Sequence, residues 1–214
     1  MKILITNDDG IKAEGLLGLV KWACKYGEVT VCAPLHEQSG KSQGIDIFHP
    51  IAVTKYDLLP EVEAYAVDST PADCVRFAIS GLKLRFDLVI SGINRGYNLG
   101  KDTMYSGTLA AATEAVTKGM KALAISTSMK YYDQAVTQLD NILRYVEENH
   151  LLEYNALYNI NIPVDPKGFR ITRLGGASFS EEFVPRENNL YYPGGHPLRA
   201  DGSNIDLDTD AAAW

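Results

Sequence analysis

The chain begins Met1-Lys2-Ile3-Leu4-Ile5-Thr6-Asn7-Asp8-Asp9-Gly10, an apolar run that ends in two adjacent carboxylates. Ile3, Leu4 and Ile5 form the uninterrupted apolar stretch typical of a strand covered on both faces. Ligands of open α/β sheets bind just beyond the carboxyl ends of parallel strands. Two neighbouring negative charges repel each other, and a hard divalent cation with oxygen ligands neutralises them. The residues also suit an Asx turn or a helix N-cap, so the pair alone leaves both interpretations open.

Alternation of apolar runs with helical patterns predicts the fold class. Helices are expected from about residue 16, from residue 70, from about residue 108 and over 133–149, and strands are expected at 3–5, 29–33, 51–55, 63–67, 88–90, 122–125 and 157–162. This order favours an α/β fold, a Rossmann-like, mostly parallel sheet with helices on both faces. We expect residues 1–163 to form this Rossmann-like domain.

The alternation of predicted strands and helices stops after Pro163. Residues 164–214 are rich in proline and glycine and contain aromatic pairs such as Tyr191-Tyr192. We therefore expect a C-terminal extended β arm with strand fragments. Its aromatic character predicts burial against another subunit, in a homodimer or homotetramer.

Composition excludes several functional classes. The formal net charge of the 214 residues is −7 (20 − 27), which argues against binding to nucleic-acid duplexes or anionic membranes. The three cysteines form no Cys-x-x-Cys pair, and the four histidines show no ligand spacing. The N-terminus lacks the pattern of a signal peptide, and no apolar run reaches membrane-spanning length. We expect a cytoplasmic protein with reduced thiols.

Polar clusters follow three of the predicted strands. Asp8 and Asp9 follow the first, Ser39-Gly40 the second, and the segment Asn94 to Thr108 the strand at 88–90. Carboxylate, hydroxyl and amide oxygens are hard ligands that suit Mg²⁺, Mn²⁺ or Ca²⁺ better than zinc.

Ser106-Gly107-Thr108 stands where a helix should begin, so its hydroxyls and N–H groups suit phosphate. A plain N-cap is the alternative, although no Glu or Gln completes a capping box there. A side chain at position 107 is expected to block phosphate with little loss of metal binding. Neither G-x-G-x-x-G, a Walker A lysine loop nor G-x-S-x-G is present. For Thr70-Pro71-Ala72-Asp73, a structural role at a helix start is favoured.

Taken together, these motifs resemble the stationary-phase survival protein SurE family of metal-dependent 5′-nucleotidases. The similarity runs in order along the whole chain, through Asn7-Asp8-Asp9-Gly10, Ala33-Pro34 with Ser39-Gly40, Thr70-Pro71-Ala72-Asp73-Cys74-Val75, the run from Ser91 to Gly100, Tyr105-Ser106-Gly107-Thr108 and Asn159-Ile160-Asn161-Ile162-Pro163.

The resemblance implies roles for particular residues. One divalent metal ion, Mg²⁺ or Mn²⁺, would be held by Asp8, Asp9, Ser39 and Asn94, and phosphate would be bound by Asn98 together with Ser106, Gly107 and Thr108.

Three departures from the family pattern stand out. Ser69 replaces the usual Gly before Thr-Pro. Ser42-Gln43-Gly44-Ile45-Asp46 replaces a Ser-x-Ser-Ile-Thr pattern, which puts substrate contacts from this loop in doubt. Family members continue beyond the point where this sequence ends, so we expect a truncated sequence.

The implied reaction is hydrolysis of nucleoside 5′-monophosphates to nucleoside and phosphate, with Asp8 and Asn98 as catalytic residues. The metal would polarise the phosphoryl group and activate water. Asp8 as the nucleophile is the open alternative, and direct attack by water is favoured because the metal needs both acids. Activity on 3′-nucleotides and polyphosphate is compatible with the resemblance. Competing hypotheses are a non-enzymatic metal- or nucleotide-binding module and a receiver-like phosphoacceptor, the latter disfavoured by chain length and by the Asn/Gly loop.

Overall fold

The computed structural model describes residues 1–176, 180–195 and 208–213. Parts of the predicted arm, at 177–179, 196–207 and 214, lie outside the described residues. The chain divides into two compact units. The first comprises 1–97 and 105–165, and the second comprises 98–104 and 166–214.

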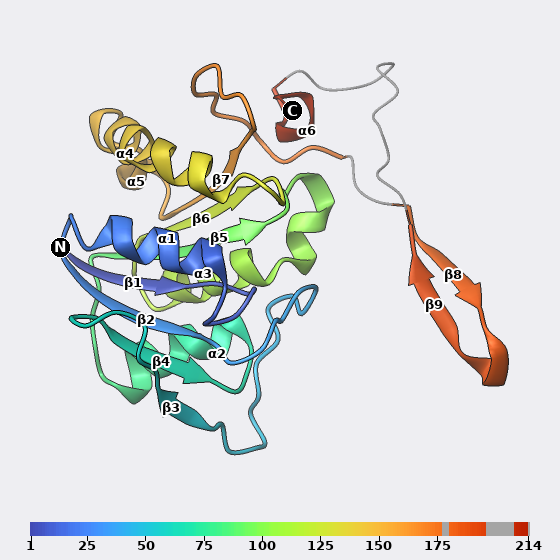
Figure 1. The fold of residues 1–214 in the computed structure, drawn as a ribbon. Coiled ribbons are helices and arrows are strands. Elements are labelled where there is room, and N and C mark those ends of the chain that lie inside the picture. The colour runs from blue at the N-terminus through green and yellow to red at the C-terminus, as the bar shows by residue number, and fades with distance from the viewer. Residues whose placement is uncertain (177–179, 196–207, 214) are drawn as a thin grey trace. The chain divides into compact units, whose positions relative to one another are not determined.

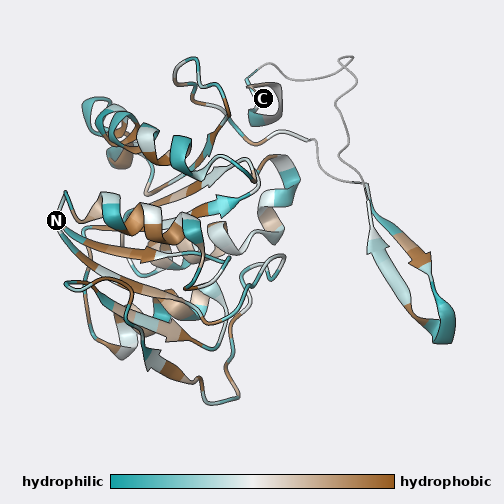
Figure 2. Cartoon of the chain, in the orientation of Figure 1, coloured by the Kyte–Doolittle hydropathy of each residue, from teal (hydrophilic) through white to brown (hydrophobic). Residues whose placement is uncertain are grey.

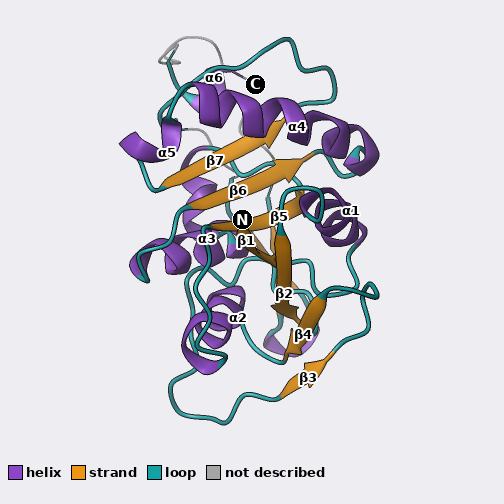
Figure 3. Ribbon diagram, turned by 90° about the vertical axis from the view of Figure 1, so that its left-hand side faces the viewer, coloured by secondary structure: helices purple, strands orange, loops and turns teal. Residues whose placement is uncertain are grey.

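A seven-stranded sheet in the order β3-β4-β2-β1-β5-β6-β7 forms the centre of the first unit (Figures 1 and 3). Only β3 is antiparallel to its neighbour, so the predicted mostly parallel sheet is confirmed. The strands are β1 (Lys2–Thr6), β2 (Glu28–Pro34), β3 (Val53–Lys55), β4 (Glu63–Val67), β5 (Leu88–Arg95), β6 (Ala122–Thr127) and β7 (Leu157–Ile162).

Helices cover both faces of this sheet, as predicted (Figure 3). Helices α1 (Glu14–Ala23) and α4 (Tyr132–Glu148) pack on one face, and α2 (Pro71–Arg76) and α3 (Gly107–Thr117) on the other. Ile3 and Ile5 of β1 belong to the core under α1 and α4, and Leu4 belongs to the opposite core. Successive residues of a strand point to opposite faces, so a strand buried on both sides needs an unbroken apolar run. Figure 2 shows the central strands as largely hydrophobic.

Strand β5 is longer than predicted, because it continues from Leu88 through the segment expected to be a loop as far as Arg95. β6 provides pairing partners there, after a register shift between Ser91 and Asn94. Gly92 lies in this shift with φ +141°, and an added Cβ would overlap the Ile125 carbonyl, so only glycine fits. Strand β3 is shorter than the predicted 51–55.

The second unit contains the strand fragments expected beyond Pro163. β8 (Glu182–Pro185) pairs antiparallel with β9 (Tyr191–Gly194), and a short helix α6 spans Asp210–Ala213. The strand pair fits the predicted arm.

The other short helices of the described residues belong to either unit. They are α5 (Leu151–Tyr154), a π-helical turn η1 (Phe77–Gly81) and the 3₁₀ turns η2 (Gly100–Tyr105) and η3 (Glu187–Asn189).

Candidate functional site

The candidate site lies at the carboxyl ends of β1, β2 and β5. β1 pairs in parallel with β2 on one side and with β5 on the other. The order of the strands reverses at this point, which is where open α/β sheets form ligand-binding crevices. Asp8 and Asp9 follow β1, Ser39 follows β2, and Asn94 lies near the end of β5.

Asn7 makes the turn that carries the two acids into the site. Its Nδ2 donates to the Gly10 carbonyl at 3.0 Å, and its Oδ1 accepts from the Gly10 N–H at 3.2 Å. The Asx-turn interpretation therefore applies to Asn7, which leaves the carboxylates of Asp8 and Asp9 for other partners.

Asp8 is the more buried acid, with 4% of its surface exposed. The pKa of its carboxyl is raised to about 6, chiefly by burial and also by the nearby charge of Asp9, against a hydrogen bond from Thr108 that lowers it. The Thr108 hydroxyl donates to Asp8 Oδ1 at 2.6 Å. Asp8 thus carries an unfavourable charge that a cation would stabilise.

Asp9 is held from β5. Its Oδ2 accepts the backbone N–H of Arg95 at 3.0 Å. Burial raises the pKa of the Asp9 carboxyl, the Arg95 hydrogen bond and charge oppose this rise, and Glu37 adds to it. Contacts with α3 and β5 therefore hold the two adjacent acids in place.

The start of α3 lies directly against Asp8. A Cβ added to Gly107 would lie 2.7 Å from Asp8 Cβ and 3.0 Å from Asp8 Oδ2. A side chain at this position would therefore disturb Asp8 itself, which argues against the expectation that it would spare metal binding; that expectation stays a prediction. Ser106 is the N-cap of α3, because its Oγ accepts the Leu109 N–H at 3.2 Å. The plain-cap interpretation therefore accounts for one lone pair of Ser106 and leaves its hydroxyl hydrogen for a ligand.

The loop after β2 brings Ser39 toward the acids. The Gln38 N–H donates to the Asp8 carbonyl at 2.8 Å, and Ile11 N–H donates to the Pro34 carbonyl at 2.8 Å. Ser39 is exposed, and its hydroxyl donates to Glu37 Oε1 at 2.8 Å. Gln38, the residue before the predicted ligand Ser39, therefore contacts Asp8 directly.

Asn94 and Asn98 differ in their placement. Asn94 is buried, and its Nδ2 donates to the Gly96 carbonyl at 2.9 Å, which leaves Oδ1 as the atom able to bind a cation. Asn98 is buried in the second unit, so its position relative to Asp8 stays a prediction.

The donor set fits a hard cation. Within the described residues no group of three or more His, Cys, Asp and Glu side chains forms a metal site. Two carboxylates, one hydroxyl and one amide oxygen are all oxygen donors, which Mg²⁺ and Mn²⁺ prefer. Burial raises the pKa of Asp8, so its negative charge is unfavourable there and a bound cation would offset that cost.

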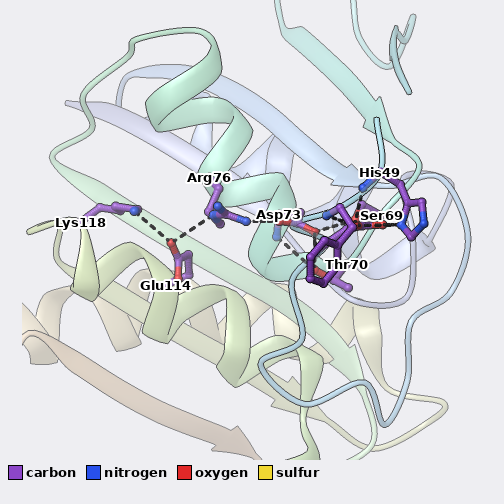
Figure 4. Close-up of polar contacts among 9 residues, drawn as sticks. His49, Ser69, Thr70, Asp73, Arg76, Glu114 and Lys118 are labelled. Atoms are coloured by element: carbon purple, nitrogen blue, oxygen red, sulfur yellow. Dashed lines mark hydrogen bonds and ion pairs between the residues drawn. The ribbon is translucent and has the colours of Figure 1, made fainter. Parts of the chain in front are cut away.

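The Thr70–Asp73 motif has the structural role that was favoured (Figure 4). Thr70 Oγ1 accepts the Asp73 N–H at 3.2 Å and so caps α2. The buried Asp73 carboxylate accepts from Ser69 Oγ at 2.7 Å and from the Asp46 N–H at 2.8 Å, and it pairs with Arg76 at 2.7 Å. This network anchors the loop after β2 to the start of α2.

Sequence reasoning missed Glu37 and Arg95. Arg95 Nη2 lies 3.6 Å from Glu37 Oε2, and both residues adjoin the predicted ligands. Their spacing in the chain carried no signal, because the contact joins the loop after β2 to the end of β5.

The amino-acid sequence also matches known proteins. A family model described as "Survival protein SurE" matches residues 3–181. The chain belongs to the SurE family. Proteins named 5′-nucleotidase SurE from Thermosipho melanesiensis and Syntrophomonas wolfei are 40% and 41% identical to it, over 100% and 92% of this chain and 85% and 80% of theirs.

A crystal structure of the SurE protein from Aquifex aeolicus has the same fold. It matches with a TM-score of 0.78 and 26% identity, over 99% of this chain and 88% of that one. The family resemblance expected from the motifs is therefore confirmed. In the described part of the chain, no helix combines the length and the apolar character needed to cross a membrane.

Proposed function

We propose that this protein is a metal-dependent 5′-nucleotidase that hydrolyses nucleoside 5′-monophosphates to nucleoside and phosphate. Membership of a family whose relatives are named 5′-nucleotidases supports the reaction. The observation that carries the proposal is the buried Asp8 beside Asp9, with Gly107 at the start of α3 directly against it. A carboxylate pair and a helix N-terminus at one point suit a cation and a phosphate together.

One divalent ion, Mg²⁺ or Mn²⁺, would be held by Asp8, Asp9, Ser39 and Asn94. When bound, such an ion polarises a phosphoryl oxygen and lowers the pKa of water. Both carboxylates then serve as ligands, which is why we assign the attack on phosphorus to water and not to Asp8.

The protein's own groups bind and orient the phosphate. The first turn of α3 places the positive end of the helix dipole at this point, where it would stabilise an anion. The Ser106 hydroxyl donates a hydrogen bond to phosphate, and Gly107 lets the chain approach closely. Thr108 donates its hydroxyl hydrogen to Asp8, and its backbone N–H acts on the same carboxyl; both lower the pKa of Asp8 and so help to keep that acid ionised.

Asn98 is assigned to the phosphate oxygens through its amide group. Its burial fits a fixed orientation of that amide. With a net charge of −7, the protein has no long-range attraction for the substrate, so these local donors and the cation must supply it.

The second unit is assigned to assembly. Phe183 and Tyr192 of the β8–β9 pair are 66% and 65% exposed, which favours burial in a homodimer or homotetramer. Sedimentation velocity over a wide concentration range tests this assignment, and a fully active monomer throughout would contradict it. A cytoplasmic location with reduced thiols belongs to the same proposal.

Steady-state hydrolysis of a substrate panel tests the function. The panel contains 5′- and 3′-nucleoside monophosphates and polyphosphate, each with Mn²⁺, Mg²⁺ or EDTA. We expect turnover of 5′-monophosphates that depends on the added metal, and the panel also measures activity on 3′-nucleotides and polyphosphate. Nucleotide binding without turnover under any metal would instead identify a binding module, and lasting self-phosphorylation would identify a phosphoacceptor.

A further inference from the structure

Glu37 connects two of the proposed metal-ligand positions. It lies two residues before Ser39, and its Oε1 accepts the Ser39 hydroxyl hydrogen at 2.8 Å. Its Oε2 lies 3.6 Å from Arg95 Nη2. The Arg95 backbone N–H donates in turn to Asp9 Oδ2 at 3.0 Å. Both carboxylate oxygens of Glu37 therefore have partners that adjoin the site.

A neutral hydroxyl binds a cation only through the lone pairs of its oxygen. Its hydrogen rotates freely unless an acceptor holds it, and a hydrogen directed at the cation would oppose binding. Groups that accept or donate hydrogen bonds behind a metal ligand fix its orientation and contribute to metal affinity. The Ser39 hydroxyl has such an acceptor in Glu37.

Arg95 makes a third carboxylate tolerable at this place. The charge of Arg95 lowers the pKa of the Asp9 carboxyl, whereas the charge of Glu37 raises it. The ion pair between Glu37 and Arg95 therefore supplies a hydrogen-bond acceptor for Ser39 while limiting the repulsion between acids.

We propose that Glu37 is a positioning residue of the metal centre, which holds the Ser39 hydroxyl with its lone pairs toward the cation while Arg95 holds Glu37. The proposal rests on the proposed function, because it requires Ser39 to be a metal ligand. Glu37 acts through Ser39 and does not touch the substrate.

A double-mutant cycle on metal affinity tests this proposal without any turnover. Isothermal titration with Mn²⁺ alone gives the Kd for the wild type, Glu37→Ala, Ser39→Ala and the double variant. We expect Glu37→Ala to weaken Mn²⁺ binding by about tenfold or more. In the Ser39→Ala background the same change should have no further effect, because the hydroxyl that Glu37 orients is gone.

Glu14→Ala is the matched control. Glu14 is exposed in the first turn of α1. Its charge raises the pKa of the Tyr132 hydroxyl, as the charge of Glu37 does, so both acids lie near the same side chain. We expect this variant to bind Mn²⁺ within about twofold of the wild type, and melting temperatures of all the metal-free variants should stay close together.

The outcomes separate the two proposals. An equal loss of affinity from Glu37→Ala with or without Ser39 would show that Glu37 acts by its charge or as a ligand itself, and would overturn its positioning role. An unchanged Kd for Glu37→Ala would overturn it too. Absence of Mn²⁺ binding by the wild type would instead overturn the proposed function and, with it, the role of Glu37.

Discussion

Replacement of Gly107 by alanine adds one methyl group at the point where α3 meets Asp8. The new Cβ would lie 2.7 Å from Asp8 Cβ and 3.1 Å from Pro71 Cγ, whereas ordinary contacts begin near 3.4 Å. The Asp8 side chain and the methyl group must therefore separate by about 0.7 Å. Pro71 crowds the same methyl group, which limits how the helix start can shift, so we expect the carboxylate of Asp8 to be displaced.

The expected loss follows from this displacement. Misplacement of a reacting group by about 1 Å costs on the order of 100-fold in rate, so kcat/KM should fall by about 10- to 100-fold, or about 1.4–2.7 kcal/mol. Overpacking costs about 1–3 kcal/mol of stability, and the higher helix propensity of alanine offsets about 1 kcal/mol of it. The protein should stay folded. The assay is kcat/KM for a 5′-monophosphate with saturating Mn²⁺, together with the Mn²⁺ Kd and the melting temperature.

Gly18→Ala is the matched control for overpacking. Its Cβ would lie 2.9 Å from Val136 Cγ2, where α1 packs against α4. This variant should lose some stability and keep its kcat/KM within about twofold. If folded Gly107→Ala also kept wild-type kinetics and Mn²⁺ affinity, the placement of Asp8 in the catalytic site would be wrong.

Three further variants test other contacts of the site. Asp8→Asn should sharply lower turnover. It should also stabilise the metal-free protein above pH 6 by up to about 3 kcal/mol. The reason is that the pKa of Asp8 is raised in the folded protein, so the stability of the wild type falls as pH rises from about 3.8 to about 6. Urea denaturation that gives the wild type and this variant the same pH dependence would refute it. Thr108→Val should weaken Mn²⁺ binding at pH 7 by about tenfold because Asp8 loses its hydrogen bond, and Thr108→Ser should preserve it; equal Kd values by titration calorimetry would contradict this. Ser106→Ala should lower the free energy of unfolding by about 1 kcal/mol through loss of the α3 cap and lower kcat/KM by about tenfold; unchanged kinetics would place the phosphate elsewhere.

Local patterns were sufficient for the framework of the fold. The run Ile3–Ile5 predicted a strand buried on both faces, and its members do divide between the two cores. The helix start at Thr70-Pro71 followed from side-chain chemistry that acts over three residues, and the structure shows that cap. These features depend on neighbours along the chain, which is why the sequence reveals them.

The extent of β5 depended on the tertiary structure. The segment Ser91–Arg95 has the glycine and asparagine content of a loop, and it forms a strand because β6 offers pairing partners at Ser126 and Thr127. Strand propensity is decided largely by such neighbours.

The sequence by itself determined which side chains could form a metal and phosphate site, since Asp8 and Asp9 are adjacent and Ser106-Gly107-Thr108 begins a helix. Only the tertiary structure decided how these groups act on one another. Thr108 bonds to Asp8 across 100 residues, and Arg95 bonds to Asp9 across 86. Such contacts depend on β1 lying between β2 and β5. The order of strands in a sheet arises from packing of the whole chain, so no local pattern of residues encodes it.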